Sequence, residues 1–265
     1  MYIGYDVFPI VRANPIASIF DHLSPPPHCI EATPLYNGYM GYRRDVFQLG
    51  EWYHCFNRGV DKRIVFEEDS DYQRFLEALY LSNSKTTDPR GSFQRLPHDD
   101  VMALPRQEPI VAVGAYCLMP NHYHLLLKEI VEGGIRTFMH RVNTGYTMYF
   151  NIRRERTGNL FVKPFRSKHI RDDRYFKRVA SYIHLNPVEL FEPRWKKGTL
   201  IRPNALEVRL REYRYSSLPE YCGEKRVYGS LLDRESVSLL SAEKESLCYL
   251  LQDRTAYYQE LGIDV

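Results

Sequence analysis

The sequence lacks the features that mark membrane proteins and disulfide- or zinc-stabilised proteins. The chain of 265 residues holds no apolar run of about 18 residues, so no segment is predicted to span a membrane. Its five cysteines are scattered and include no CxxC pair, which argues against a zinc ribbon and a disulfide framework. The first residues, MYIGYDVFPIVRANP, lack the layout of a secretory signal. We therefore expect a protein of the reducing cytoplasm.

A strong excess of one charge is also missing, because the net charge is only +3, but the distribution of charge is uneven. Residues 136–178 hold 12 Lys and Arg against three acids, a local balance of +9, which leaves about −6 for the rest of the chain. We call residues 136–178 the basic-aromatic stretch. Its interleaved aromatic residues are Phe138, Tyr146, Tyr149, Phe150, Phe161, Phe165, Tyr175 and Phe176.

Cations that neutralise phosphates, beside rings that stack on bases, are typical of proteins that bind single-stranded nucleic acid. The alternative is a solvated basic helix face whose aromatic residues lie in the core. On the first interpretation, the candidate phosphate contacts are Arg153, Arg154, Arg156, Lys163, Arg166 and Lys168.

Hydrophobic periodicity predicts the order strand, helix, strand, strand, helix, strand, helix. The strands are expected at 46–56, 110–119, 122–130 and 159–170, and the helices begin near Asp69, Gly134 and Asp172. This order favours an α+β fold, a ferredoxin-like or RRM-like antiparallel sheet with helices packed on one face, plus a helical C-terminal extension.

The expected organisation has three parts. Residues 1–44 contain three consecutive prolines and little periodicity, and we expect an irregular N-terminal extension. Residues 45–221 hold the α+β domain, in which the polar segment 82–109 is predicted to be a long loop. Residues 222–265 are expected to form an acidic helical extension, since residues 231–265 contain seven acids and three basic residues.

His122 and His124 flank Tyr123 in a predicted strand. Alternate side chains of a strand project to the same face, so the two imidazoles can meet one divalent metal. Two half-exposed strand histidines without a ligand are the alternative, because the bare His-x-His pattern is weakly specific.

Tyr182 and Asn186 stand one helical turn apart in the segment SYIHLNP. Asn186 can offer its amide oxygen to a hard cation, and Tyr182 would then lie beside that cation. Two other interpretations stay open. Tyr182 falls on an apolar stripe with Tyr175 and Val179, as a core tyrosine would, and Asn186 before a proline could simply end the helix.

Four motifs occur in an order that resembles the HUH single-tyrosine transposases, and most of all the REP-associated tyrosine transposases. They are YHCFNRG, MPNHYHLLL, GNLFVKPFRS and YIHLNPV, at residues 53–59, 119–127, 158–167 and 182–188. A late segment, YRYSSLPEY at 213–221, is similar to the family's tryptophan-serine-serine segment with Tyr215 in place of tryptophan. The resemblance covers about residues 45–221.

The resemblance implies a role for each matching residue. His122 and His124 match the metal-binding histidines, Asn186 the third metal ligand and Tyr182 the nucleophile. Two imidazoles and an amide oxygen suit Mg²⁺ or Mn²⁺ on a phosphate better than a closed zinc site. The implied reaction is cleavage and rejoining of single-stranded or hairpin DNA, such as a repeated palindrome, through a 5′-phosphotyrosine. A monomer and a homodimer both remain open.

Two other functions compete with this one. The first is a non-catalytic, domesticated nucleic-acid-binding protein on the same fold, although such a protein has no use for His122, His124, Tyr182 and Asn186 together. The second is another HUH enzyme. In relaxases the tyrosine precedes the histidines, which is not the order here, whereas replication initiators are separated from this chain only by the YIHLNPV segment.

Overall fold

The computed structural model describes residues 46–86, 96–105, 108–193 and 203–241. The chain divides into two units, residues 1–40 and 41–265. The first unit, and with it the predicted irregular extension at 1–44, lies outside the described residues. The following paragraphs concern the second unit alone.

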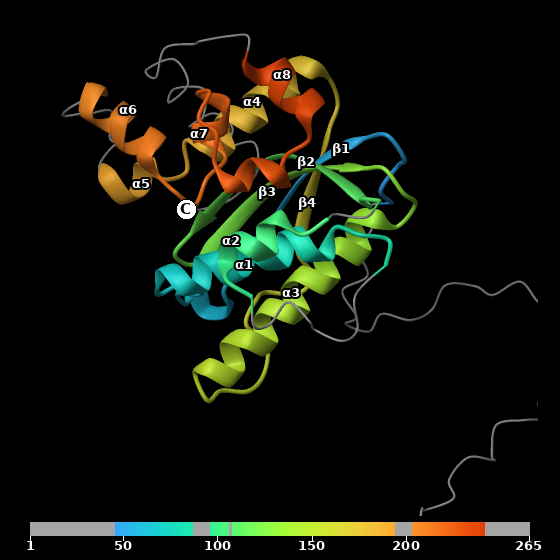
Figure 1. The fold of residues 1–265 in the computed structure, drawn as a ribbon, viewed down its shortest axis with the longest axis vertical. Helices are drawn as coiled ribbons and strands as arrows, with labels where there is room; N and C mark the ends of the chain where they lie inside the picture. The colour runs from blue at the N-terminus through green and yellow to red at the C-terminus, as the bar shows by residue number, and fades with distance from the viewer. Residues whose placement is uncertain (1–45, 87–95, 106–107, 194–202, 242–265) are drawn as a thin grey trace, which may run out of the picture. The chain divides into compact units, whose positions relative to one another are not determined.

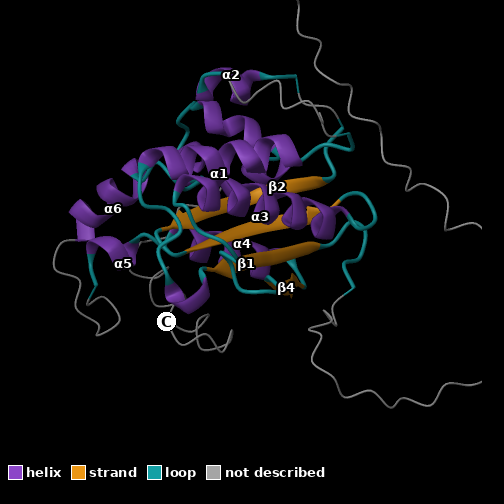
Figure 2. Ribbon diagram, turned by 90° about the horizontal axis from the view of Figure 1, so that it is seen from below, coloured by secondary structure: helices purple, strands orange, loops and turns teal. Residues whose placement is uncertain are grey.

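A four-stranded antiparallel sheet forms the centre of this unit (Figure 2). Its strands are β1 (Trp52–Arg58), β2 (Val111–Met119), β3 (His122–Glu129) and β4 (Arg166–Ile170). They lie in the order β2-β3-β1-β4, and β1 pairs antiparallel with both β3 and β4. With a helix between β1 and β2 and another between β3 and β4, this is the ferredoxin-like arrangement that the sequence predicts.

Strand alternation divides the sheet into two apolar faces. On β3, Tyr123, Leu125 and Leu127 belong to one buried cluster, while Leu126 belongs to another. Because neighbouring residues of a strand point to opposite sides, His122 and His124 share the face of Leu126. We call this side the histidine face.

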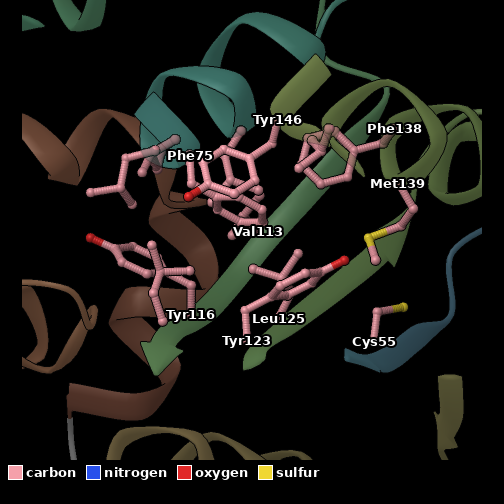
Figure 3. Close-up of a cluster of buried hydrophobic side chains, with 14 of the residues drawn as sticks. Cys55, Phe75, Val113, Tyr116, Tyr123, Leu125, Phe138, Met139 and Tyr146 are labelled. Atoms are coloured by element: carbon pink, nitrogen blue, oxygen red, sulfur yellow. The ribbon is translucent and has the colours of Figure 1, made fainter. Parts of the chain in front are cut away.

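Helices α1 (Asp69–Ser82) and α3 (Gly134–Arg153) cover the face opposite the histidine face (Figure 1). Helix α1 begins with a reciprocal capping box between Glu68 and Asp71. Rings of both helices, Phe75 and Tyr146 among them, converge on strand residues such as Tyr123 (Figure 3). Helix α3 is anchored at its start by the buried carboxylate of Glu129, which accepts hydrogen bonds from two backbone N–H groups of its first turn.

Helix α4 (Asp173–His184) packs on the histidine face, so helices lie on both sides of the sheet (Figure 1). The side chain of Asp172 caps the helix by accepting a hydrogen bond from the backbone of Tyr175, at 2.8 Å. Phe176, Val179 and Ile183 are buried against the sheet. The sequence predicts this helix, but the expectation that the helices pack on one face of the sheet is wrong, because α4 buries its apolar side on the opposite face from α1 and α3.

The segment 82–109 is not a continuous loop, which corrects one prediction. Helix α2 (His98–Ala103) forms within it and buries Val101 and Met102. Its two adjacent buried residues among polar neighbours are too short a pattern to show helical periodicity. Residues 87–95 and 106–107 lie outside the described part of the chain.

The chain after α4 forms short elements. They are α5 (Val188–Phe191), α6 (Pro203–Glu212), α7 (Leu218–Tyr221), the 3-10 helix η4 (Val227–Leu231) and α8 (Arg234–Ser241). Tyr228, Leu231 and Leu232 are part of the same buried cluster as α1 and α3. Residues 227–232, which the sequence assigns to an appended extension, therefore contribute to the main core. Among the described residues, no helix is long and apolar enough to cross a bilayer.

Candidate functional site

Three histidines gather on the histidine face of the sheet. His122 and His124 come from β3, and their ring centroids lie 5.1 Å apart with the rings perpendicular. His54 comes from the neighbouring strand β1, and its ring centroid lies 5.1 Å from that of His124. We call His54, His122 and His124 the histidine cluster.

The tautomer of His122 follows from its hydrogen bonds. Its Nδ1 lies 2.6 Å from Oδ1 of Asn121, and the amide nitrogen of Asn121 donates to the carbonyl of Lys62, at 3.2 Å. The second contact fixes which end of the amide is the oxygen, and an amide oxygen only accepts. The Nδ1 atom of His122 therefore carries the proton, and in the neutral ring Nε2 holds the lone pair that a metal can take.

His124 and His54 share a hydrogen bond inside the protein. Nε2 of His54 lies 2.9 Å from Nδ1 of His124, and both rings are buried. Burial, and after it the positive charge of Lys168, lowers the pKa of His54 from 6.5 to about 3, so this ring is neutral.

Tyr182 of α4 meets the histidine cluster. Its ring is perpendicular to that of His124 with the centroids 5.4 Å apart, and it meets His54 edge-on at 5.5 Å. The side chain is 1% exposed and lies in the same buried cluster as Val179. The apolar stripe and the approach to the histidines, which the sequence offers as alternatives, are both features of this one side chain.

Asn186 lies one turn beyond Tyr182 and is fully buried. Its amide nitrogen donates to the backbone carbonyls of Tyr182 and Ile183, at 3.0 and 3.2 Å. These bonds commit the nitrogen to the end of α4, so the amide oxygen is the atom that this side chain can offer to a cation.

By their chemistry, the predicted ligands fit a divalent metal of the kind that acts on phosphates. Nε2 of His122, one nitrogen of His124 and the amide oxygen of Asn186 would hold such an ion and leave positions for phosphate and water. The described residues contain no group of three His, Cys, Asp or Glu side chains that could hold a metal.

Two of the predicted phosphate contacts are engaged within the protein. Arg153 pairs with Glu68 at 2.5 Å, and Arg154 pairs with Glu67 at 2.9 Å and with the buried Asp71 at 3.1 Å. A third, Arg156, donates to Asn151 and to the backbone of residue 159. These arginines hold the end of α3 against the start of α1 and the following loop.

The other three predicted contacts lie elsewhere. Lys163 is exposed in the loop before β4, and Arg166 and Lys168 are on β4. Arg166 is paired in register with Phe56, and Lys168 with His54, so both share the histidine face. The Lys168 ammonium also lies over the ring of Tyr175, 5.5 Å from its centroid. The structure thus splits the basic-aromatic stretch into two regions.

His54 is a third histidine of this site that the sequence patterns do not single out. It lies within the YHCFNRG motif, but nothing in a single sequence indicates which residue of β3 it faces. The register of β1 on β3 places Phe56 opposite His124 and His54 opposite Leu126, which puts His54 diagonally beside His124 on the same face. The signal that could have suggested it is a histidine on a neighbouring predicted strand, at a position whose side chain would point to the same face of the sheet as His124.

Comparison with known proteins gives one structural likeness. A solved structure described as a REP-associated tyrosine transposase bound to a REP hairpin matches with a TM-score of 0.43 and 16% sequence identity. The match covers 75% of this chain and 96% of that one. No protein-family model matches the chain, and no curated protein matches it. At this identity, the activity of the neighbour does not transfer to this chain by similarity alone.

Proposed function

We propose that this chain cleaves and rejoins single-stranded or hairpin DNA, with Tyr182 as nucleophile and with His122, His124 and Asn186 as ligands of Mg²⁺ or Mn²⁺. One observation carries the proposal: the ring of Tyr182 packs directly on His124, on the face that His122 shares. Sequence separation alone would not bring these residue types together, because about 60 residues of chain lie between the two segments.

The proposed reaction uses the Tyr182 hydroxyl, a DNA phosphate and a divalent metal. The phenolic oxygen of Tyr182 forms a bond to the scissile phosphorus while the bond from phosphorus to the 3′ oxygen breaks. The products are a 5′-phosphotyrosine and a free 3′-hydroxyl, with the phenolic proton passing to solvent and the leaving oxygen taking one up. A divalent metal, when bound, stabilises charge on the phosphate oxygens. Rejoining is the reverse attack by a 3′-hydroxyl, so the bond energy is conserved.

The chain's own residues supply the positioning. Asn121 holds His122 through its Nδ1 atom, and Asn186 is held by the last turn of α4. Because Tyr182 is 1% exposed, attack on a phosphate requires a movement that uncovers its hydroxyl. Lys168, in register with His54, is one of the predicted basic residues on the face of the histidine cluster.

The same burial favours a second candidate, a non-catalytic DNA-binding protein on this fold. A tyrosine that is 1% exposed is a normal core residue, and in that case Tyr182 has a packing role only. The two candidates make opposite predictions for the hydroxyl group.

The deciding experiment is the replacement Tyr182→Phe. Phe keeps the ring and its contacts with His54 and His124, so fold and DNA affinity should be preserved. Cleavage and the covalent protein–DNA adduct should disappear together, because both need the same oxygen. The assay uses single-stranded hairpin DNA with Mg²⁺ or Mn²⁺ and a denaturing gel.

Tyr175→Phe on the same helix is the matched control and should leave the adduct intact. A Tyr182→Phe protein that still forms the adduct would move the nucleophile elsewhere, with Tyr175 the next candidate. A wild-type protein that binds hairpins but gives no adduct on any of them would establish the non-catalytic binder.

A further inference from the structure

His54 is the one member of the histidine cluster to which the proposed function gives no task. It is fully buried, and its Nε2 atom lies 2.9 Å from Nδ1 of His124. Its ring also packs against that of Tyr182, with the two ring centroids 5.5 Å apart. A buried imidazole that contacts both the candidate ligand and the candidate nucleophile is placed to influence how they are oriented.

The hydrogen bond between the two rings contains a single proton. If His54 donates through Nε2, then Nδ1 of His124 accepts, and the neutral His124 ring carries its proton on Nε2. That tautomer has no lone pair left for a metal. If His124 donates through Nδ1 instead, its Nε2 atom holds the lone pair. Only the second arrangement is compatible with a metal ligand at His124.

We infer that His54 is a positioning residue for His124: its Nε2 atom accepts the Nδ1 proton of His124 and thereby keeps Nε2 of His124 as the metal-binding nitrogen. The inference rests on the proposed function and assigns His54 no contact with metal or DNA. It gives His124 the same arrangement as His122, whose Nδ1 atom donates to Asn121. Ligand histidines are commonly oriented in this way by an acceptor on their other nitrogen.

The strand register explains why β1 supplies this group. β1 lies between β3 and β4 in the sheet, so a residue on its histidine face can contact both neighbours. His54 contacts His124 on one side and is in register with Lys168 on the other.

The first test measures Mn²⁺ binding without DNA, by titration calorimetry on the full chain. His54→Leu removes the acceptor and keeps an apolar side chain, whereas His54→Gln keeps an acceptor oxygen. We expect His54→Leu to weaken Mn²⁺ binding by about 10–100-fold and His54→Gln to recover most of that loss. His169→Leu, at an exposed residue on the opposite face of β4, is the control and should bind Mn²⁺ as the wild type does.

Hairpin DNA affinity in EDTA should stay within about twofold for all three variants, because none removes a phosphate contact. Wild-type Mn²⁺ affinity in a folded His54→Leu protein overturns the inference and leaves the proposed function standing. Equal losses in the Leu and Gln variants reduce His54 to a packing residue. A wild-type protein that binds no Mn²⁺ overturns the metal role of the whole cluster.

A second measurement needs no variant. In ¹⁵N-histidine spectra of the wild-type protein with Mg²⁺, we expect His124 protonated at Nδ1 and His54 unprotonated at Nε2. A proton on Nε2 of His124 under these conditions contradicts the inference, even if the His54→Leu chain fails to fold.

Discussion

Neighbouring polar groups decide which nitrogen of each β3 histidine carries a proton. Asn121 fixes His122 because its own amide nitrogen is held by the Lys62 carbonyl. His124 depends on His54, which is itself a titratable ring. At the scale of single residues, the two histidines of one motif therefore differ, and His124 is the one whose environment comes from another strand.

Removing the imidazole of His122 or of His124 should abolish DNA cleavage while leaving most DNA binding. For His124→Ala we expect a fall in the cleavage rate of at least about 100-fold, because metal stabilisation of phosphate charge is worth several kcal/mol. Hairpin affinity measured by fluorescence anisotropy should change little. His140→Ala, exposed on α3, should match the wild type in both assays. A His124→Ala chain with unchanged cleavage would exclude a metal role for this residue.

The residues whose pattern is local were within reach of the sequence. His122 and His124 sit two apart on a strand, and Tyr182 and Asn186 four apart on a helix, so short-range geometry suggests their pairing. His54 could not be found in this way, because its contact with His124 depends on how β1 aligns with β3. The burial of Tyr182 was equally open, since one stripe on α4 can face either core or solvent.

Among the elements, helix α4 is fixed to the sheet by the segment after α6. Residues 215–217 run along the outer edge of β2, where the N–H of Ser217 donates to the carbonyl of Tyr116, at 3.0 Å. The Ser217 hydroxyl accepts from the N–H of Tyr116 at 2.9 Å and bonds to Nε2 of His184 at 2.8 Å. Burial lowers the pKa of His184 to about 3, so its ring is neutral in this contact. One hydroxyl thus joins α4, β2 and the C-terminal segment.

Ser217→Ala should destabilise the fold through this junction. It leaves the buried N–H of Tyr116 and Nε2 of His184 without the hydroxyl, a loss expected to cost about 1–3 kcal/mol in the free energy of unfolding. Urea denaturation followed by circular dichroism measures this difference. Ser238→Ala, whose exposed hydroxyl donates to the Arg234 carbonyl within α8, should stay within about 0.5 kcal/mol of the wild type. Equal midpoints for the two variants would show that the junction carries no stability.

Hydrophobic periodicity predicts where the helices and strands lie in the sequence better than it predicts which elements pack against one another. The strands and the three long helices follow from alternation and helical spacing, because burial imposes those periods directly. Their ends differ by several residues in β1 and β4, because a turn at residues 49–50 and bends at residues 163–164 interrupt the expected strands. Helix α2 was not predicted, because its two buried residues are too few to show helical periodicity. The packing of residues 227–232 into the main core was not predicted, because an acidic composition does not indicate where the few apolar residues of the segment are buried.

Within the described molecule, the predicted phosphate contacts are divided between two places. At the end of α3, Arg153 and Arg154 are neutralised by Glu67, Glu68 and Asp71 of the α1 region. On β4, Arg166 and Lys168 share the face of the histidine cluster. The sequence could not separate these groups, because Arg153 and Glu68 are 85 residues apart. Under the proposed function, the second group would be the one that holds a strand beside Tyr182.

The division of charge predicts two different phenotypes within the basic-aromatic stretch. Replacing Lys163, Arg166 and Lys168 by Gln, singly and together, should weaken binding of single-stranded hairpin DNA. Each lost phosphate contact should reduce the slope of log affinity against log salt by about 0.7. Arg154→Gln should leave that slope unchanged and lower stability instead, by at least about 1 kcal/mol, because it withdraws a charged partner from the buried Asp71. Anisotropy titrations over a range of salt concentrations, beside urea denaturation of the same proteins, measure both quantities. A salt slope that falls for Arg154→Gln and stays constant for the triple variant would place the DNA path along α3 and away from the histidine face.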